Sequence, residues 1–487
     1  MNLADVFVGL ASRWPDRKAI LSPHLTLSFG QLTARAAQSA KELRSRGIRP
    51  GANVGICIRD NAETLVLMIA IWMLGATAVT IDFRTNLAEQ AVLAKEFDLI
   101  AILKDRQSAA EGYDPILIDA SWSDVICGHD ATPLWRNEER RAAPAFISLT
   151  SGTTGRPLGV VVDHDRALLR FIFDLSQRFG PTLLNPLSLS FSASCIHTFS
   201  AMLRGSAVCF HPILFSPQQL ADAIVATQAT SVCTVPSIIR NLLEVFGQRS
   251  NPLFGSLEAL YCFGAPMSPE EKMQAKAFLC KNLIQEYGSS LSGRISALSG
   301  SDLDTHLDTV GRVLPLVALE IVDADDKVLR SGEVGTIRVR SPAMARALYA
   351  ENTRPSGDQL KEGWAYPGDI GTVDEGGFLR LLGRTSDLII RGGVNVHPSE
   401  VEAAISEHVG VREVAVVGFA KWPEGEEIAA FVVPSGNLTE ASLVAHCRAR
   451  LSSDKRPRKF AFVTELPRNA SGKISREKLR QNLDSAG

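Results

Sequence analysis

Residues 148–162 read SLTSGTTGRPLGVVV, so glycines and hydroxyl residues stand between two apolar runs. Glycine lets the main chain approach a ligand closely. Serine and threonine hydroxyls add donors to exposed backbone N–H groups, and such a concave surface suits phosphate oxygens. The candidate phosphate-binding residues are Thr150, Ser151, Gly152, Thr153, Thr154 and Gly155. The loop does not follow the Walker A spacing, and a hydrophilic turn without a ligand is the alternative.

Length and charge limit the classes of protein that fit. The chain has 487 residues, more than the roughly 250–300 at which one hydrophobic core stops growing, so at least two domains are expected. Its net charge of −2 creates no overall field that attracts nucleic acid or an anionic membrane. No nucleic-acid partner is therefore expected, and any site for a polyanion has to be local.

The eight cysteines are scattered and form no C-x-x-C pair, which indicates buried, reduced thiols in a cytoplasmic protein. The first twenty residues lack the basic and apolar regions of a secretory signal. The apolar stretch 65–81 is just short of a membrane span and is divided by Gly75. We interpret it as a buried helix ending near Gly75, followed by a buried strand, and expect no membrane span.

Helical and strand patterns alternate along the first 140 residues and again over 160–260. Strand–helix–strand order is typical of parallel sheets covered by helices. Residues 319–342 instead alternate apolar and polar positions around a turn, which predicts an antiparallel hairpin. Residues 376–393 are interpreted as a second hairpin-like element with a break near Arg384–Asp387. The last ~100 residues predict a small α+β unit of autonomous size, with its boundary at 386/387.

Further stretches carry candidate functional residues. The stretch LIQEYGSSLSG (283–293) predicts a strand followed by a turn of small hydroxyl residues. It nearly matches the G-x-S-x-G nucleophile motif of serine hydrolases, but Ser292 stands where the last glycine should be. A serine hydrolase therefore stays a weak competing hypothesis. The stretch GWAYPGDIG (363–371) predicts a turn that contains Asp369. Its carboxylate could accept hydrogen bonds from two sugar hydroxyls, or it could form an Asx turn. Two more stretches carry candidate residues. The first is GRTSDLIIRGGVNVHPSEVE (383–402), with Arg384, Asp387, Gly392 and Gly393, and the second is LPRNASGKISREKLR (466–480), with Lys473.

In this order and spacing, the five motifs resemble the adenylate-forming superfamily of acyl- and aryl-CoA ligases, adenylation domains of nonribosomal peptide synthesis, and luciferases. The resemblance covers essentially the whole chain. It implies an α/β fold with a large AMP-binding domain (1–386) of parallel, helix-covered sheets and a small barrel-like β part. A small, mobile α+β C-terminal domain (387–487) is expected to follow. It also implies activation of a carboxylate with ATP to acyl-AMP and pyrophosphate, and then transfer to a thiol.

The resemblance implies a role for each motif. Nucleotide contacts are expected from the loop 150–155, from Gly264, Ala265 and Pro266, and from Glu286, Tyr287, Gly288, Ser289 and Ser290. Asp369 and Arg384 match the residues that contact the ribose. Asp387 matches the hinge, Gly392 and Gly393 match the loop that lines the thiol tunnel, and Lys473 matches the lysine that reaches the carboxylate and the α-phosphate. In such chemistry, most of the rate acceleration comes from hydrogen-bond donors that are fixed around the charge developing in the transition state.

Two positions depart from the family pattern. The phosphate loop usually ends Pro-Lys-Gly, but here Leu158 replaces the lysine. The usual glutamate that helps to hold Mg²⁺ is replaced by Leu291, and leucine cannot ligate a metal. Either water or another carboxylate replaces this glutamate as a ligand of Mg²⁺, or adenylation is slow or lost. The residues that would bind the metal are therefore left unassigned.

Residues 188–208 resemble the helix that enters the acyl site. Relatives that activate amino acids carry Phe-Asp there, whereas Phe191 is followed by Ser192 in this chain. A buried ammonium without a counter-charge is costly, so a fatty, branched or aryl acid is expected rather than an α-amino acid. His197 points into the pocket or is a satisfied helix histidine. The candidate lining residues are Phe191, Ser192, Ala193, Cys195, His197, Phe199 and Phe263.

Residues 448–480 hold eleven Lys/Arg and three Asp/Glu, a local excess of eight positive charges. This basic segment could contact the phosphates of CoA, meet the acidic face of a carrier protein, or be a solvated face. The expected function is therefore an acid–thiol ligase that uses ATP, Mg²⁺ and coenzyme A. The alternatives are an enzyme that loads an acyl carrier protein and a catalytically impaired nucleotide-binding relative.

Overall fold

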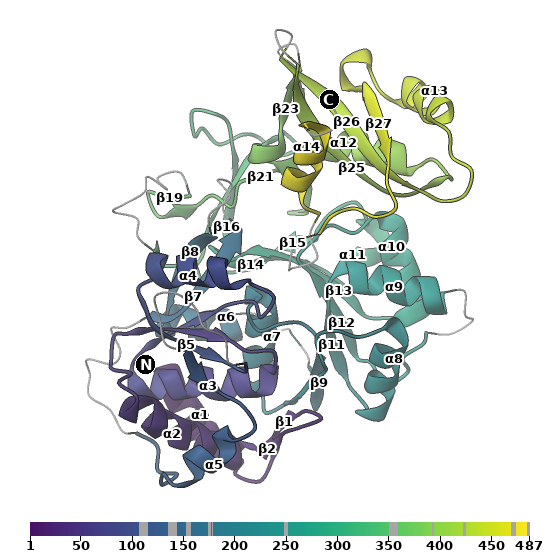
Figure 1. Ribbon diagram of the computed structural model, residues 1–487. Coiled ribbons are helices and arrows are strands. Elements are labelled where there is room, and N and C mark those ends of the chain that lie inside the picture. Colours follow the sequence, from purple (N-terminus) through teal and green to yellow (C-terminus); the bar gives the residue numbers. More distant parts are fainter. Residues whose placement is uncertain are drawn as a thin grey trace. The chain divides into compact units, whose positions relative to one another are not determined.

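The computed structural model describes residues 1–106, 115–134, 144–151, 157–173, 177, 179–247, 252–349, 359–391, 394–421, 425–468 and 474–484. The chain packs into two compact units (Figure 1). The first unit comprises 1–318 and 339–365, and the second comprises 319–338 and 366–487. The prediction that a mobile domain begins at 387 concerns motion and stays a prediction.

The first unit contains a seven-stranded sheet in the order β18-β8-β7-β4-β3-β5-β6. Strands β7, β4, β3, β5 and β6 run parallel, which agrees with the alternating pattern in the sequence. The strands are β3 (Asn53–Cys57), β4 (Thr77–Thr80), β5 (Leu99–Lys104), β6 (Pro115–Leu117), β7 (Pro144–Ser151), β8 (Pro157–Asp163) and β18 (Ala347–Leu348). The helices in this part of the chain are α1 (Leu3–Arg13), α2 (Phe29–Ser45), α3 (Asn61–Leu74), α4 (Leu87–Glu96), α5 (Trp122–Cys127) and α6 (His164–Ile172).

Helix α3 and strand β4 confirm the interpretation of the long apolar stretch. Asp60 caps the helix by accepting a hydrogen bond from the backbone of Ala62, and every residue of the helix is buried. The helix ends at Gly75, whose φ of 73° lies in the left-handed region that favours glycine. A helix apolar on all sides is a core helix when the elements around it cover each face.

The first unit also contains a nine-stranded sheet in the order β15-β14-β13-β12-β11-β9-β10-β1-β2. Strands β1, β10, β9, β11, β12 and β13 are parallel, and the edges are antiparallel. The strands are β1 (Lys18–Leu21), β2 (Thr26–Ser28), β9 (Thr182–Asn185), β10 (Ala207–Phe210), β11 (Ser231–Thr234), β12 (Ala259–Phe263), β13 (Leu283–Ser289), β14 (Gly293–Leu298) and β15 (Arg312–Val313).

Helices cover both faces of this sheet. Helices α8, α9 and α10 form one layer beside strands β9 to β13 (Figure 1), and their apolar residues share a core with Leu260 and Cys262 of β12. Helix α7 contacts strands β9 and β10. The helices are α7 (Ser192–Leu203), α8 (Pro217–Ala226), α9 (Pro236–Phe246), α10 (Pro269–Gln274), the π-helical turn η2 (Ala275–Leu279) and α11 (Asp302–Thr305).

The predicted change to antiparallel structure after residue 300 is confirmed. Strand β16 (Ala318–Val322) pairs with β17 (Gly335–Arg340) after the turn at Asp323–Lys327. The second predicted hairpin is wrong, because β22 (Leu379–Arg384) pairs with β21 (Asp369–Val373) and not with β23 (Ile389–Arg391). The 3₁₀ turn η4 (Thr385–Asp387) redirects the chain between them. The short strands β19 (Leu360–Lys361) and β20 (Trp364–Ala365) pair with each other in the first unit.

The second unit ends in a five-stranded sheet with its own helices. Its order is β24-β23-β26-β25, and β27 pairs with β26. This confirms the predicted α+β segment, and its apolar core lies between the sheet and helices α12 and α13. The elements are β23, β24 (Val394–Val396), α12 (Pro398–Ser406), β25 (Val411–Lys421), β26 (Gly425–Pro434), α13 (Glu440–Arg450), η5 (Ser453–Lys455), β27 (Lys459–Phe462) and α14 (Arg476–Asp484).

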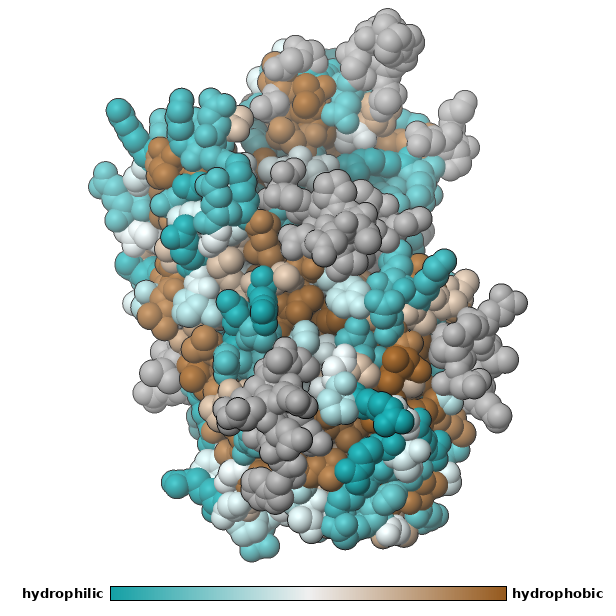
Figure 2. Space-filling view, turned by 90° about the vertical axis from the view of Figure 1, so that its left-hand side faces the viewer, coloured by the Kyte–Doolittle hydropathy of each residue, from teal (hydrophilic) through white to brown (hydrophobic). Residues whose placement is uncertain are grey.

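Among the described residues, none of the helices combines the length and the apolar character needed to cross a bilayer. On the face shown in Figure 2, brown residues occur in groups between teal ones. Seven of the eight cysteines are buried, as the sequence predicted, and Cys127 is exposed.

Candidate nucleotide and acyl site

The glycine- and hydroxyl-rich stretch connects two antiparallel strands. Strands β7 and β8 pair up to Ser151 and Pro157, with Leu158 opposite Thr150. Thr150 and Ser151 therefore stand at the end of β7. The candidate residues Gly152, Thr153, Thr154 and Gly155 lie outside the described residues.

The candidate adenine-binding segments lie at the carboxyl ends of two neighbouring parallel strands. Gly264, with Ala265 and Pro266, follows β12, while Tyr287, Gly288, Ser289 and Ser290 lie at the end of β13 and the turn after it. Residues Phe263 and Glu286 are register partners across these strands. Ligands of parallel α/β sheets bind outside the carboxyl ends of the strands, so the two segments are placed where a nucleotide is expected.

Gly264 has a φ of 94°, in the region that favours glycine. A Cβ at this position would lie 3.1 Å from Cζ of Phe191, tighter than most Cβ contacts. Gly264 thus lets the loop after β12 turn sharply beside the ring of Phe191.

The buried side chain of Arg170, in α6, hydrogen-bonds to the backbone of the turn after β13. Its Nη2 donates hydrogen bonds to the backbone carbonyls of Ser290 (2.9 Å) and Leu291 (3.1 Å), and its Nε donates to the carbonyl of Ala343 (2.8 Å). Full burial lowers the pKa of this guanidinium to about 10, so it stays charged at neutral pH. Arg170 was not predicted from the sequence, because an arginine in an amphipathic helix ordinarily lies on the solvent face.

Leu291 is buried in this turn, with 6% of its surface exposed. Within the described ranges no three His, Cys, Asp or Glu residues gather in a way that could hold a metal ion. The residues present therefore do not form a metal site at the position where the family uses a glutamate.

A buried ionic cluster lies next to the ends of β12 and β13. Nε2 of His197 is 3.0 Å from Oε2 of Glu286, and Nη1 of Arg294 is 3.3 Å from its Oε1. Gln177 donates a hydrogen bond of 2.7 Å to the same Oε1. Nδ1 of His197 is 2.8 Å from the carbonyl oxygen of Ala193. Both ring nitrogens thus lie beside oxygen atoms, Nε2 beside the Glu286 carboxylate and Nδ1 beside the carbonyl of Ala193.

The charge of Glu286 follows from these partners. Burial alone would raise the pKa of its carboxyl group. The charges of His197 and Arg294 and the hydrogen bonds from His197 and Gln177 outweigh burial, so this pKa lies below its ordinary value. Glu286 is therefore an anion that its neighbours already engage, rather than an exposed group that faces the nucleotide.

Aromatic rings pack on the same cluster. The imidazole of His197 stacks on Phe263 (centroids 4.6 Å apart, planes at 24°) and lies 5.2 Å from the ring of Tyr261. Phe263 in turn contacts the half-buried Phe191, at 5.8 Å between centroids. His197 is thus both a satisfied helix histidine, through Ala193, and a member of the cluster beside the candidate acyl site.

The other candidates on α7 separate into two groups. Ser192 and Ala193 are half-buried at the start of the helix. Cys195 is buried, and burial raises the pKa of its thiol to about 12, so it is no nucleophile at neutral pH. The ring of Phe199 instead packs in the core against Phe7, Trp72 and Phe171.

Asp369 and Arg384 form an ion pair in the second unit. They are register partners on β21 and β22, and Nε of Arg384 lies 3.1 Å from Oδ1 of Asp369. Nη2 of Arg384 also donates to the carbonyl of Pro367 (2.6 Å). The two residues that the resemblance assigns to the ribose are therefore neighbours.

Asp387, the candidate hinge residue, ends the turn η4 and contacts helix α14. Its carboxylate lies 3.5 Å from Nη1 of Arg476 and 3.6 Å from Nη2 of Arg480. These two arginines were not singled out from the sequence. Gly392, Gly393 and Lys473 lie outside the described residues.

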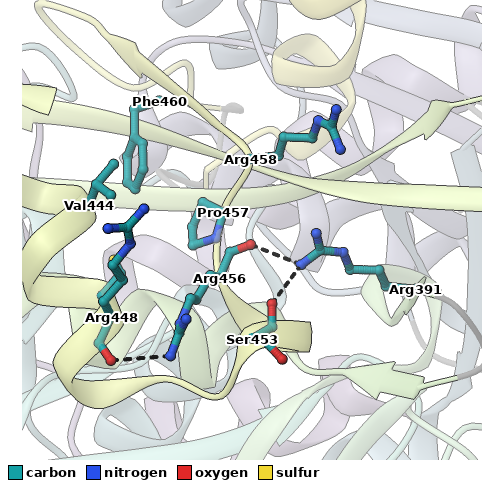
Figure 3. Close-up of a pocket in the computed structure, with 9 residues that line it drawn as sticks. Arg391, Val444, Arg448, Ser453, Arg456, Pro457, Arg458 and Phe460 are labelled. Atoms are coloured by element: carbon teal, nitrogen blue, oxygen red, sulfur yellow. Dashed lines mark hydrogen bonds between the residues drawn. The ribbon is translucent and has the colours of Figure 1, made fainter. Parts of the chain in front are cut away.

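The second unit also contains a cavity of about 250 Å³ lined by arginines (Figure 3). Arg391 donates to the carbonyls of Ser453 and Arg456, and Arg456 donates to that of Arg448, so two of the guanidinium groups organise the backbone. The side chains of Arg448 and Arg458 are exposed at the cavity. A cavity with this charge suits a phosphate or carboxylate group.

Helix-covered parallel sheets, turns of small residues at the carboxyl ends of β12 and β13, and an α+β segment at the end of the chain are the features expected of the class of adenylate-forming enzymes. The chain belongs to the AMP-binding enzyme family: the family model for AMP-binding enzymes matches residues 9–349, and the model for the AMP-binding enzyme C-terminal domain matches residues 400–473.

Several characterised proteins are similar over nearly the full length. The 2-succinylbenzoate–CoA ligases of Bacillus cytotoxicus and Bacillus licheniformis are 28% and 29% identical, with 96% of this chain covered and 96% and 97% of theirs. The structure of ATP-bound MatB from Rhodopseudomonas palustris matches with a TM-score of 0.90 and 25% identity, over 100% of both chains. The structure of o-succinylbenzoate CoA synthetase from Bacillus subtilis with its acyl-adenylate intermediate matches with a TM-score of 0.85 and 25% identity, over 98% of this chain and 97% of that one.

Proposed function

We propose that this protein activates a carboxylic acid other than an α-amino acid with ATP, releases pyrophosphate, and transfers the acyl group from acyl-AMP to coenzyme A. The observation that carries the proposal is the convergence of the 264–266 and 287–290 segments at the carboxyl ends of β12 and β13 in a chain of this family. The names of the similar CoA ligases support the same reaction.

In the proposed reaction, the substrate carboxylate attacks the α-phosphate, and pyrophosphate leaves. The backbone and hydroxyls of residues 150–155 would hold the phosphates, and Asp369 would accept hydrogen bonds from the ribose hydroxyls. Lys473 would donate to the oxygens on which negative charge increases. Donors that are fixed before the reaction stabilise this charge without further reorganisation.

Mg²⁺ would enter as part of the MgATP substrate. Leu291 offers no ligand, and the described residues form no metal cluster, so we assign no protein ligand and no catalytic step to the ion. Magnesium usually keeps several waters and binds through substrate phosphates, which makes a site with few protein ligands compatible with MgATP.

The arginine-lined cavity supports coenzyme A as the acceptor. Arg448 and Arg458 present guanidinium groups at a cavity of about 250 Å³, where a phosphate of CoA could accept hydrogen bonds. An acidic carrier protein is the second candidate, because the basic segment 448–480 would also attract an acidic surface.

Incubation of the protein with MgATP, a panel of carboxylic acids and either CoA or a phosphopantetheinylated carrier protein tests this function. We expect AMP and an acyl-CoA thioester, identified by mass spectrometry. Thioester on the carrier protein alone would reject CoA as the acceptor. Binding of ATP without product from any acid would support the impaired relative instead.

Substitution of Asp369 by asparagine should raise the KM for ATP about tenfold, because an amide accepts ribose hydrogen bonds less strongly than a carboxylate. The KM for the acid should change little. Steady-state kinetics at saturating acid measures this, with Asp374→Asn, in the turn between β21 and β22, as the matched control. An unchanged KM for ATP would remove Asp369 from the nucleotide site.

Reversal of charge at the cavity, in the double variant Arg448→Glu and Arg458→Glu, should raise the KM for CoA about tenfold or more while adenylation continues at the wild-type rate. Arg330→Glu, an exposed arginine of the same unit outside the cavity, is the control. Equal effects of both variants on the KM for CoA would reject the cavity as a phosphate site.

A further inference from the structure

A buried cluster of polar and aromatic side chains lies at the ends of β12 and β13, beside the two nucleotide segments. We define the floor cluster as Gln177, His197, Tyr261, Phe263, Glu286 and Arg294. Phe263 immediately precedes the candidate segment 264–266, and Glu286, itself one of the candidate nucleotide residues, immediately precedes the segment 287–290. As register partners on parallel strands, their side chains project from the same face of the sheet. Cys262, the neighbour of Phe263 along β12, faces the opposite core. The floor cluster thus lies on the face toward α7.

Every member of the floor cluster is nearly inaccessible. The exposed fractions are 6% for Gln177, 1% for His197, 0% for Tyr261, 3% for Phe263, 6% for Glu286 and 8% for Arg294. His197 joins the two halves of the cluster, because its ring stacks on Phe263 while its Nε2 lies 3.0 Å from Glu286. A chain that extends past Phe263 would have to displace rings that already contact one another.

The chemistry of the cluster also opposes an alkyl chain. A methylene chain is bound well by apolar walls that release water on contact. Here it would lie against a carboxylate, an imidazole and a guanidinium, and would separate the buried Glu286 from its partners His197 and Arg294. Phe191, in contrast, is half-buried, and its ring is tilted by 43° to the ring of Phe263, so the outer part of the site has aromatic surface.

We propose that the floor cluster restricts the acyl site to short-chain or single-ring carboxylic acids and excludes medium- and long-chain fatty acids. This inference rests on the proposed function, since it concerns the acid that the enzyme adenylates. His197 and Phe263 are the specificity-determining residues, because they close the site from the helix and from the strand respectively. Of the fatty acids expected from the sequence, the medium- and long-chain ones are thereby removed from the expected substrates, and the short-chain ones stay.

The test measures kcat/KM for butanoate, benzoate, octanoate and dodecanoate in the wild type and in His197→Ala. Wild type should use at least one of the first two and discriminate against octanoate and dodecanoate. His197→Ala should raise the ratio of octanoate to butanoate about tenfold or more, since a pocket that fits or rejects a few methylenes changes kcat/KM by this order. Phe263→Ala opens the same space without removing a partner of Glu286, and should shift the ratio in the same direction if His197→Ala does not fold.

Phe171→Leu is the matched control, because Phe171 is equally buried but packs on Phe199, away from the floor cluster. Phe171→Leu should lower the free energy of unfolding without changing the ratio of kcat/KM for octanoate to that for butanoate. A wild type that uses dodecanoate as well as butanoate would overturn the inference and leave the proposed function intact. If no acid in a broad panel supports acyl-AMP formation, the proposed function itself fails. A ratio unchanged in a folded His197→Ala or Phe263→Ala variant would reject these residues as the determinants.

Discussion

Replacement of Lys473 by alanine should lower the rate of acyl-AMP formation about a hundredfold or more and leave transfer from supplied acyl-AMP to CoA nearly unchanged. The resemblance assigns Lys473 to the first half-reaction, where negative charge builds on the α-phosphate and the attacking carboxylate. Loss of one donor aimed at such charge typically costs about two to three orders of magnitude in rate. The second half-reaction releases AMP and does not need that donor.

Two assays on the same preparation separate the steps. Pyrophosphate exchange reports acyl-AMP formation, and thioester formation from synthetic acyl-AMP reports transfer. Lys478→Ala, an exposed lysine of helix α14, is the matched control and should behave as wild type in both assays. Equal losses in the two assays for Lys473→Ala would contradict the assignment to adenylation.

Glu286→Gln should lower the free energy of unfolding by about 3–5 kcal/mol at pH 7. The substitution keeps the shape of the side chain but leaves the buried His197 and Arg294 without their counter-charge, and breaking a buried pair from one side costs this much. Denaturant unfolding of both proteins measures the difference. Glu270→Gln, an exposed acid on α10, should change stability by less than about 0.5 kcal/mol.

The pH dependence of that difference has a definite sign. The pKa of Glu286 in the folded protein lies below the ordinary value of 4.5, so its ionised form is favoured by folding. Its contribution is fully present above pH 4.5 and is lost as the pH falls through the folded pKa. The gap between wild type and Glu286→Gln should therefore be constant from pH 7 to 5 and shrink below pH 4.5. A Glu286→Gln variant as stable as wild type at pH 7 would show that the pairing of Glu286 with His197 and Arg294 contributes no net stability.

The sequence predicted those elements whose signal is local. Helix α3 and strand β4 follow from one apolar run, a capping aspartate and a glycine in the left-handed region at Gly75. The turns after β12 and β13 follow from small residues at the ends of buried strands. In these places the residues that form the element also determine where it ends.

Partners that are distant in the sequence could not be predicted in the same way. The apolar pattern of 379–391 is compatible with a hairpin, but β22 pairs back to β21, and η4 leads β23 into another sheet. The guanidinium of Arg170 reaches a turn about 120 residues away. Likewise, the buried ionic cluster around Glu286 forms only because α7, β13 and β14 meet, whereas the sequence alone predicted Glu286 as one more residue near the nucleotide.

Acid-dependent exchange of labelled pyrophosphate into ATP tests the central claim most directly. The proposed chemistry predicts label in ATP only when MgATP and a suitable short-chain or aryl acid are both present, with no need for CoA. The claim would be contradicted if the protein bound ATP but incorporated no label with any acid of a broad panel.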